Sequence, residues 1–209
     1  MDDFVTEEQR VEALHAWWRR NGAAAILVVL FALAGLLGWQ YWQQRQRGAA
    51  QQASLQYDGV LAALGAGDAA QVRERGQLLR NAHPDSTYSV LAALAMARAA
   101  SDAGDVAAAL EQLGWVAAHA GTPELREVAH LRAARLLLGA GKLDEALAEL
   151  GRSMSAGFAA EREELRGDIA FARGDMATAR SAYTAAVAAA GPAATLIQLK
   201  LDNLPAVEK

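Results

Sequence analysis

The segment Gly104-Asp105-Val106-Ala107-Ala108-Ala109-Leu110-Glu111-Gln112-Leu113 decides the fold, because variants of it recur along the chain. Similar segments begin at Gly141 and Gly174, and a weaker one begins at Gly67, so successive glycines are 37, 37 and 33 residues apart. Periods of this size are typical of solenoids built from helix pairs. Glycine accepts the left-handed conformation just past a helix end, and the Asp after three of these glycines can cap the next helix. We therefore predict a turn between two helices at each position.

Small residues recur at two fixed places around the last three turns. One set follows the glycines by five residues, and a second set precedes the first by twelve residues. These residues are Ala109, Ala146 and Ala179, preceded by Ala97, Ala134 and Gly167, with the bulky Leu113, Leu150 and Tyr183 four positions later. The pattern resembles tetratricopeptide repeats, whose paired helices approach closely at small residues. The repeats are degenerate, since Ala93, His130 and Glu163 stand where a bulky or aromatic residue is expected early in the first helix.

The predicted fold class is all-α, with a single N-terminal transmembrane helix followed by an α-solenoid of degenerate tetratricopeptide-like helix pairs. Prolines fall only between apolar-periodic runs, as expected for an all-helical chain. A last helix that opens at Pro192 should cap the stack. The predicted helices are 49–65, 69–81, 86–102, 106–119, 124–139, 143–154, 158–172, 175–190 and 192–203.

An apolar stretch, Gly22 to Trp42, predicts the membrane anchor. It holds no charge, and about 20 apolar residues in a helix cross a hydrocarbon core of about 30 Å. Aromatic residues lie at both of its ends, where they suit the headgroup level, and arginines lie beside them. They are Trp17, Trp18, Trp39, Tyr41 and Trp42, with Arg19, Arg20, Arg45 and Arg47. A cleaved signal peptide and a buried soluble helix are the alternatives, but a signal peptide has a shorter apolar region and a small-residue cleavage site.

The basic residues beside this stretch favour a cytoplasmic N-terminus only weakly. Three arginines (10, 19 and 20) precede the stretch and two (45 and 47) follow it. The chain has no cysteine, which suits an oxidising, periplasm-like compartment and is compatible with the cytosol as well. Its net charge of −4 and lack of a basic patch argue against a nucleic-acid partner. We expect a cytoplasmic segment (1–21), an anchor (22–42), a linker (43–48), one repeat domain (49–204) and a tail (205–209).

The sequence offers no catalytic constellation, cofactor site or metal site. The four histidines are too scattered for metal-ligand spacing. Gly141-Lys142 lacks the other residues of a phosphate-binding loop, so we interpret it as an interhelix turn. The acidic residues Glu161, Glu163 and Glu164 lie at a helix start, where negative charge is favourable. An enzyme would have to rely on residues such as Glu163 or His130, and we predict that the protein is not one.

A solenoid presents a concave face built from the first helix of each pair, so we expect binding there. The position after the small residue of each first helix is Arg98, Arg135 or Asp168, and Arg132 and Arg166 lie nearby. Arginines there can meet carboxylates or backbone carbonyls of a partner. The alternative is an ion pair between Arg135 and Asp168 across neighbouring repeats. Leu94, Leu131 and Leu138 belong either to the core or to the groove.

Short segments spread in order over nearly the whole chain carry a family resemblance. They are Gly38-Trp39-Gln40-Tyr41-Trp42, Ala53-Ser54-Leu55-Gln56-Tyr57, Leu131-Arg132-Ala133-Ala134-Arg135, Leu165-Arg166-Gly167-Asp168, Gly174-Asp175, Ala179-Arg180-Ser181-Ala182 and Leu199-Lys200-Leu201-Asp202-Asn203-Leu204. With them the chain resembles the YfgM-like ancillary subunits of the bacterial Sec translocon.

The resemblance implies a single-pass inner-membrane protein with a cytoplasmic N-terminus and a periplasmic repeat domain. It also implies association with the Sec channel, with a membrane-anchored periplasmic peptidyl-prolyl isomerase chaperone and with client proteins that emerge from the channel. In some members the cytoplasmic end is linked to a response regulator of envelope stress, a role that the acidic segment Asp2 to Glu12 could serve here. Ala34 and Gly38, four residues apart, would let another membrane helix approach. The alternative function is a membrane-tethered adaptor for another envelope assembly, such as cytochrome maturation or outer-membrane biogenesis.

Overall fold

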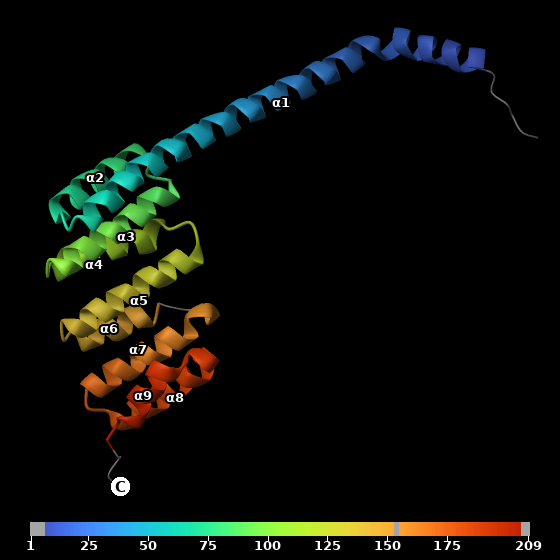
Figure 1. Ribbon diagram of the computed structural model, residues 1–209. Helices are drawn as coiled ribbons and strands as arrows, with labels where there is room; N and C mark the ends of the chain where they lie inside the picture. The colour runs from blue at the N-terminus through green and yellow to red at the C-terminus, as the bar shows by residue number, and fades with distance from the viewer. Residues whose placement is uncertain (1–6, 153–154, 206–209) are drawn as a thin grey trace, which may run out of the picture. The chain divides into compact units, whose positions relative to one another are not determined.

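The computed structural model describes residues 7–152 and 155–205, and this part of the chain is helical throughout, with turns and no strand (Figure 1). Its α-helices are α1 (Glu7–Gly65), α2 (Ala69–Ala82), α3 (Thr87–Asp102), α4 (Val106–His119), α5 (Pro123–Gly139), α6 (Leu143–Leu150), α7 (Ala159–Ala172), α8 (Met176–Ala190) and α9 (Thr195–Asp202). Two short 3₁₀ helices, η1 (Ala156–Phe158) and η2 (Gly191–Ala193), precede α7 and α9. The predicted all-α fold class is confirmed.

The chain divides into two compact units at Ala49–Ala50, and α1 belongs to both of them. Residues 43–48, predicted as a linker, are helical, and the helix predicted at 49–65 is the C-terminal part of α1. The physical reason is composition, because Gln, Arg and Ala favour a helix and no proline interrupts them. The segments 1–6 and 206–209, which hold the first five residues of the predicted acidic segment Asp2 to Glu12 and all but the first residue of the tail, lie outside the described residues.

The four predicted interhelix turns occur at the predicted glycines. Gly67, Gly104, Gly141 and Gly174 all have positive φ, between 71° and 80°, where a side chain would be strained. The Asp residues at 68, 105 and 175 each accept a hydrogen bond from the backbone N–H three residues later, at 3.0 Å. Lys142, which replaces Asp at the third turn, makes no such cap. The predicted glycine turns and the three Asp caps are confirmed.

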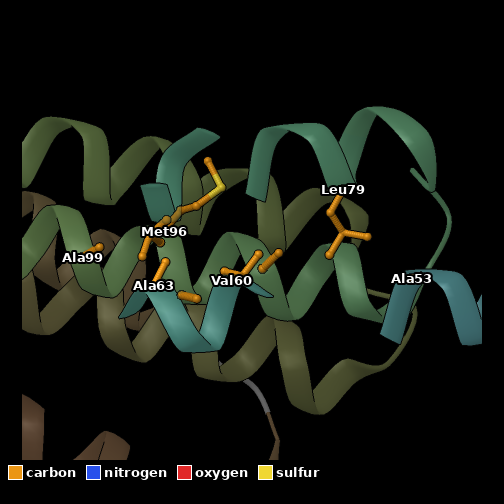
Figure 2. Packing of buried hydrophobic residues seen from close by; sticks show 9 residues of the cluster. Ala53, Val60, Ala63, Leu79, Met96 and Ala99 are labelled. Carbon is orange, nitrogen blue, oxygen red and sulfur yellow. The ribbon is translucent and has the colours of Figure 1, made fainter. Parts of the chain in front are cut away.

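The repeat unit, residues 50–205, buries a core that continues from one helix pair to the next. Its apolar clusters each draw on three consecutive helices: α1–α3, α3–α5, α5–α7 and α7–α9. Figure 2 shows the first cluster, in which Ala53, Val60 and Ala63 of α1 lie near Leu79 of α2 and Met96 of α3. Because each pair shares its core with the next, the unit is a solenoid in which stability depends on neighbouring repeats.

Small residues set the close packing inside the pairs. Ala109, Ala146 and Ala179 are completely buried, and Ala97 and Ala134 nearly or completely so. Gly167 is the extreme case, because a Cβ on it would lie 2.5 Å from ring carbons of Tyr183. The ring of Tyr183 therefore occupies the space that a side chain at position 167 would need.

Several helix boundaries differ from the predictions. The structure ends α6 at Leu150, four residues before the predicted end, because Gly151 takes the C-cap position. Pro192 lies within η2, and α9 itself begins at Thr195. The capping helix is thus shorter than predicted, although it packs on α8 as expected.

Candidate functional site

A pocket of about 540 Å³ opens within the repeat unit, between the first helices of three successive pairs. The C-terminal part of α1 supplies Tyr57, Leu61 and Leu64 to its lining, and α3 and α5 supply most of the other lining residues. Only Leu113, on α4, comes from a second helix. The pocket therefore lies on the surface that first helices build in a solenoid, where we expected a groove.

The wall of this pocket is largely apolar. Its large apolar residues are Tyr57, Leu61, Leu64, Leu91, Leu94, Leu113 and Leu136. Leu94 and Leu113 are also core residues, at 9% and 2% exposure, so they form the inner wall of the pocket. Leu61 is 43% exposed and Leu91 and Leu136 are half-buried, which leaves apolar surface open to a ligand. The sequence assigned Leu94, Leu131 and Leu138 either to the core or to the groove. Leu94 belongs to both, while Leu131 and Leu138 pack in the core cluster of α5–α7.

Three of the predicted arginines lie at this pocket: Arg98, Arg132 and Arg135. Arg98 is exposed and already paired, since its Nε donates to Asp102 at 2.6 Å one turn later on α3. Arg132 and Arg135 lie three residues apart on α5 and are exposed. Within residues 7–152 and 155–205, neither has an ion-pair or hydrogen-bond partner. The pocket thus carries two uncompensated guanidinium groups beside an apolar wall.

The other two predicted residues, Arg166 and Asp168, lie on α7 outside the pocket. Arg166 donates to Glu163 at 3.1 Å, one turn earlier. Asp168 accepts hydrogen bonds from Lys200 at 2.8 Å and from the hydroxyl of Tyr183 at 2.7 Å. The alternative ion pair between Arg135 and Asp168 is therefore wrong, because groups on α8 and α9 occupy the carboxylate.

Lys200 is the polar residue that the sequence pattern did not indicate. Its Nζ donates to Asp168 and, at 2.6 Å, to Glu164, so one ammonium group joins α9 to two carboxylates on α7. Burial lowers the pKa of Lys200, but these hydrogen bonds outweigh it and the net pKa is raised. Burial, together with the hydrogen bond to Asp168, raises the pKa of Tyr183 well above its ordinary value. The i, i+4 spacing of Glu164 and Asp168 indicates one acidic helix face, but not the cation 32 residues away that neutralises it.

The residues that an enzyme would use have ordinary structural partners. The Nδ1 of His130 lies 2.9 Å from a carboxylate oxygen of Glu149 on α6. Glu163 accepts from Arg166, and Glu164 accepts from Lys200. Gly141-Lys142 forms the turn between α5 and α6 and does not open a phosphate loop. Among the described residues, no group of three His, Asp or Glu side chains is placed to hold a metal ion.

In the N-terminal unit, α1 is the one helix, among described residues, that is long and apolar enough to cross a membrane. The rings of Trp17, Trp18, Trp39, Tyr41 and Trp42 are all more than half exposed, and Arg45 lies 5.1 Å from the centre of the Tyr41 ring. Ala34 and Gly38 are also exposed, and a Cβ on Gly38 would meet no other atom within 4 Å. Whether this surface contacts another membrane helix stays a prediction.

Comparison with known proteins places this architecture in a family. Residues 15–206 match the model of the tetratricopeptide repeat-like domain. A curated protein of Aggregatibacter actinomycetemcomitans named "Ancillary SecYEG translocon subunit" is 33% identical over 96% of this chain and 98% of its own length. The chain belongs to the family of ancillary SecYEG translocon subunits. The member of this family from Escherichia coli K12 is 31% identical over 98% of this chain and 99% of its own length. The ancillary subunits thus match the N-terminal helix and the repeats alike, and the resemblance in the sequence is confirmed.

Proposed function

We propose that this protein is a membrane-anchored scaffold of the SecYEG translocon that holds partner or client proteins through the pocket of its repeat unit. The observation that carries the proposal is the pocket itself, an open apolar wall beside two unpaired arginines in a family of translocon subunits. Pockets that are mostly apolar with a few placed polar groups are typical of binding sites. The protein is a binding subunit and not an enzyme in this proposal.

The anchor in this proposal is the apolar section of α1, residues 22–42. Its exposed apolar side chains suit lipid, and the aromatic rings and arginines at its two ends suit the headgroup regions. The N-terminus lies in the cytoplasm and the repeat unit lies in the periplasm, so that the pocket meets proteins that leave the channel. The partners are the Sec channel, a membrane-anchored periplasmic peptidyl-prolyl isomerase chaperone and translocating clients. The cytoplasmic segment is available to a response regulator.

The experiment that tests the scaffold role is copurification of the full-length protein in a mild detergent, followed by mass spectrometry. The test variant combines Arg132→Glu and Arg135→Glu, which reverses the charge at the pocket. The control combines Arg73→Glu and Arg152→Glu, two exposed arginines on other parts of the repeat unit, with the same change in net charge. We expect channel and isomerase subunits with the wild type and the control, and a loss of the isomerase or of clients with the test variant.

Other results would point elsewhere. Recovery of a different envelope assembly, with channel subunits missing from every sample, would replace the translocon role with that of a general envelope adaptor. Equal recovery of all partners by the test variant would remove the pocket from the proposal while leaving the translocon association intact.

The absence of native cysteine allows a direct test of orientation. Single-cysteine variants Glu12→Cys and Ala107→Cys place exposed thiols on either side of the proposed anchor. In cells with a permeabilised outer membrane, a membrane-impermeant maleimide should label Ala107→Cys at once and Glu12→Cys only after lysis. The reverse pattern would overturn the orientation, and a mature chain that lacks the apolar stretch 22–42 together with the residues before it would indicate a cleaved signal peptide.

A further inference from the structure

We infer that the pocket selects a particular chemistry, namely a protein segment that places an apolar side chain against the leucine wall and a carboxylate against Arg132 and Arg135. This inference rests on the proposed binding function and names the ligand class of the same pocket. It is based on an imbalance of charge at the pocket and on the position of the open apolar surface.

The charge imbalance lies on the α5 side of the pocket. Three other arginines of the repeat unit have an acid partner three or four residues away: Arg98, which also lines the pocket, pairs with Asp102, Arg152 with Glu149 and Arg166 with Glu163. Arg132 and Arg135 lack such compensation in the part of the chain that the structure describes. A chain with a net charge of −4 thus leaves two positive groups without an acid partner at this pocket. Carboxylates are the protein groups that complement guanidinium groups best, often with two parallel hydrogen bonds.

The spacing of the two arginines fits one short acidic segment. Residues three apart on a helix lie on one face, so Arg132 and Arg135 flank the same strip of α5. Leu136, the residue after Arg135, lines the pocket too. A carboxylate that meets these arginines therefore lies next to the apolar wall, and its own chain must carry an apolar residue close to the acid.

The other side of the pocket is electrically balanced. Arg98 lies on α3 and its charge is shared with Asp102, one turn away. The α1 side contributes Tyr57, Leu61 and Leu64, with no charged side chain in the lining. The ligand is therefore oriented, with its acidic part over α5 and its apolar part toward α1 and α3.

The test uses the full-length protein in detergent micelles and two short fluorescent peptides that differ only in charge. Both peptides carry the same leucines; one has two glutamates beside them and the other has glutamines there. Binding is followed by fluorescence anisotropy at low and high salt. The test variant combines Arg132→Gln and Arg135→Gln. The matched control combines Arg73→Gln and Arg75→Gln, two exposed arginines of α2 that have no ion-pair partner among the described residues. Circular dichroism of each variant verifies that the helices are retained.

We expect the acidic peptide to bind the wild type and the control about three- to tenfold more tightly than the neutral peptide. The preference should shrink at high salt and vanish in the Arg132→Gln, Arg135→Gln variant. Equal binding of the two peptides would overturn the carboxylate preference and leave the binding pocket in place. A preference that survives in the test variant, or that falls equally in the control, would also overturn it. Binding of neither peptide, with partners still lost from the charge-reversed variant in copurification, would overturn the short-segment ligand while leaving the scaffold role standing.

Discussion

The helices α5 and α7 occupy equivalent places in successive repeats, but their polar residues have opposite surroundings. In α5, Arg135 comes directly after the small residue Ala134 and has no ion-pair partner among the described residues. In α7, Asp168 comes directly after the small residue Gly167 and is held by Lys200 and by Tyr183. The side chain at this repeat position thus has no ion-pair partner in one pair, whereas in the next pair residues of α8 and α9 bond to it.

The difference has a physical origin in the helices that come next along the chain. The pair that contains α5 precedes another pair, which covers its core. The rim of α5, which carries Arg132 and Arg135, stays exposed. The pair that contains α7 precedes the single short helix α9, which brings Lys200 over α7. A terminal repeat must satisfy its exposed surface without a neighbour. We therefore interpret the α7–α9 end as structural and the α5 rim as the part available for binding.

The largest expected effect on stability comes from truncating Tyr183 at the α7–α9 end of the repeat unit. Tyr183 is 3% exposed and fills the space over Gly167, so Tyr183→Ala leaves a cavity between α7 and α8. We expect a loss of about 3–5 kcal/mol in the free energy of unfolding of the repeat unit. Chemical denaturation measures the loss, and hydrogen exchange should place it first in α7–α9. Tyr183→Phe, which keeps the ring, should cost only about 1 kcal/mol for the hydrogen bond to Asp168.

A smaller effect should result from adding a methyl group under the same ring. In Gly167→Ala the new Cβ would lie 2.5 Å from the ring of Tyr183, which forces α7 and α8 apart. We expect a loss of about 1–3 kcal/mol, even though alanine favours a helix by about 1 kcal/mol. The matched control is Gly114→Ala on α4, where the Cβ meets nothing within 4 Å and the change should stabilise. Equal effects of the two changes on the unfolding midpoint would contradict the close approach at Gly167.

The ion-pair group of the structural end should contribute less, because it is partly exposed. The side chain of Lys200 is 39% exposed, and those of Glu164 and Asp168 are 24% and 26% exposed. Lys200→Met leaves two neighbouring carboxylates without their cation, and we expect a loss of about 1–2 kcal/mol. Thermal unfolding at low and high salt measures it, with a larger loss at low salt.

Tyr183 and Lys200 should also make the stability of the repeat unit fall at alkaline pH. The pKa values of Tyr183 and Lys200 are both raised in the folded protein. The unfolded chain therefore loses these protons first as the pH rises past about 10, and the stability that they contribute falls from that point upward. We expect the wild-type unfolding midpoint to drop above pH ~10, and to drop less in a Tyr183→Phe, Lys200→Met double variant. Parallel pH profiles for the two proteins would exclude these residues as the cause.

This contrast between α5 and α7 was only partly predictable from the sequence. The glycine turns, the Asp caps and the small buried residues repeat at fixed intervals, so local rules located them. Three of the five candidate groove residues, Arg98, Arg135 and Asp168, follow the same periodicity, and Arg132 and Arg166 are their neighbours. Of the five, Arg98, Arg132 and Arg135 line the pocket. What separates them from Asp168 is the long-range contact with Lys200, and a periodic pattern carries no information about such a contact. The continuous helix α1 was missed for a related reason, since a change of composition at residue 43 does not require a change of backbone conformation.

The smallest expected effect on stability is that of the two unpaired arginines of α5, and it tests the difference between α5 and α7 most directly. In Arg132→Ala with Arg135→Ala, no ion pair of the described residues is lost, so the free energy of unfolding should change by no more than about 0.5 kcal/mol. Removing two uncompensated positive charges that lie three residues apart on one helix even relieves a weak repulsion. The measurement is chemical denaturation beside Lys200→Met under the same conditions. If the double variant destabilises the protein as much as Lys200→Met does, the two arginines are structural. If only Lys200→Met destabilises it, the free charge at α5 is available for a ligand, because a residue that contributes nothing to folding can be retained at a pocket for binding alone.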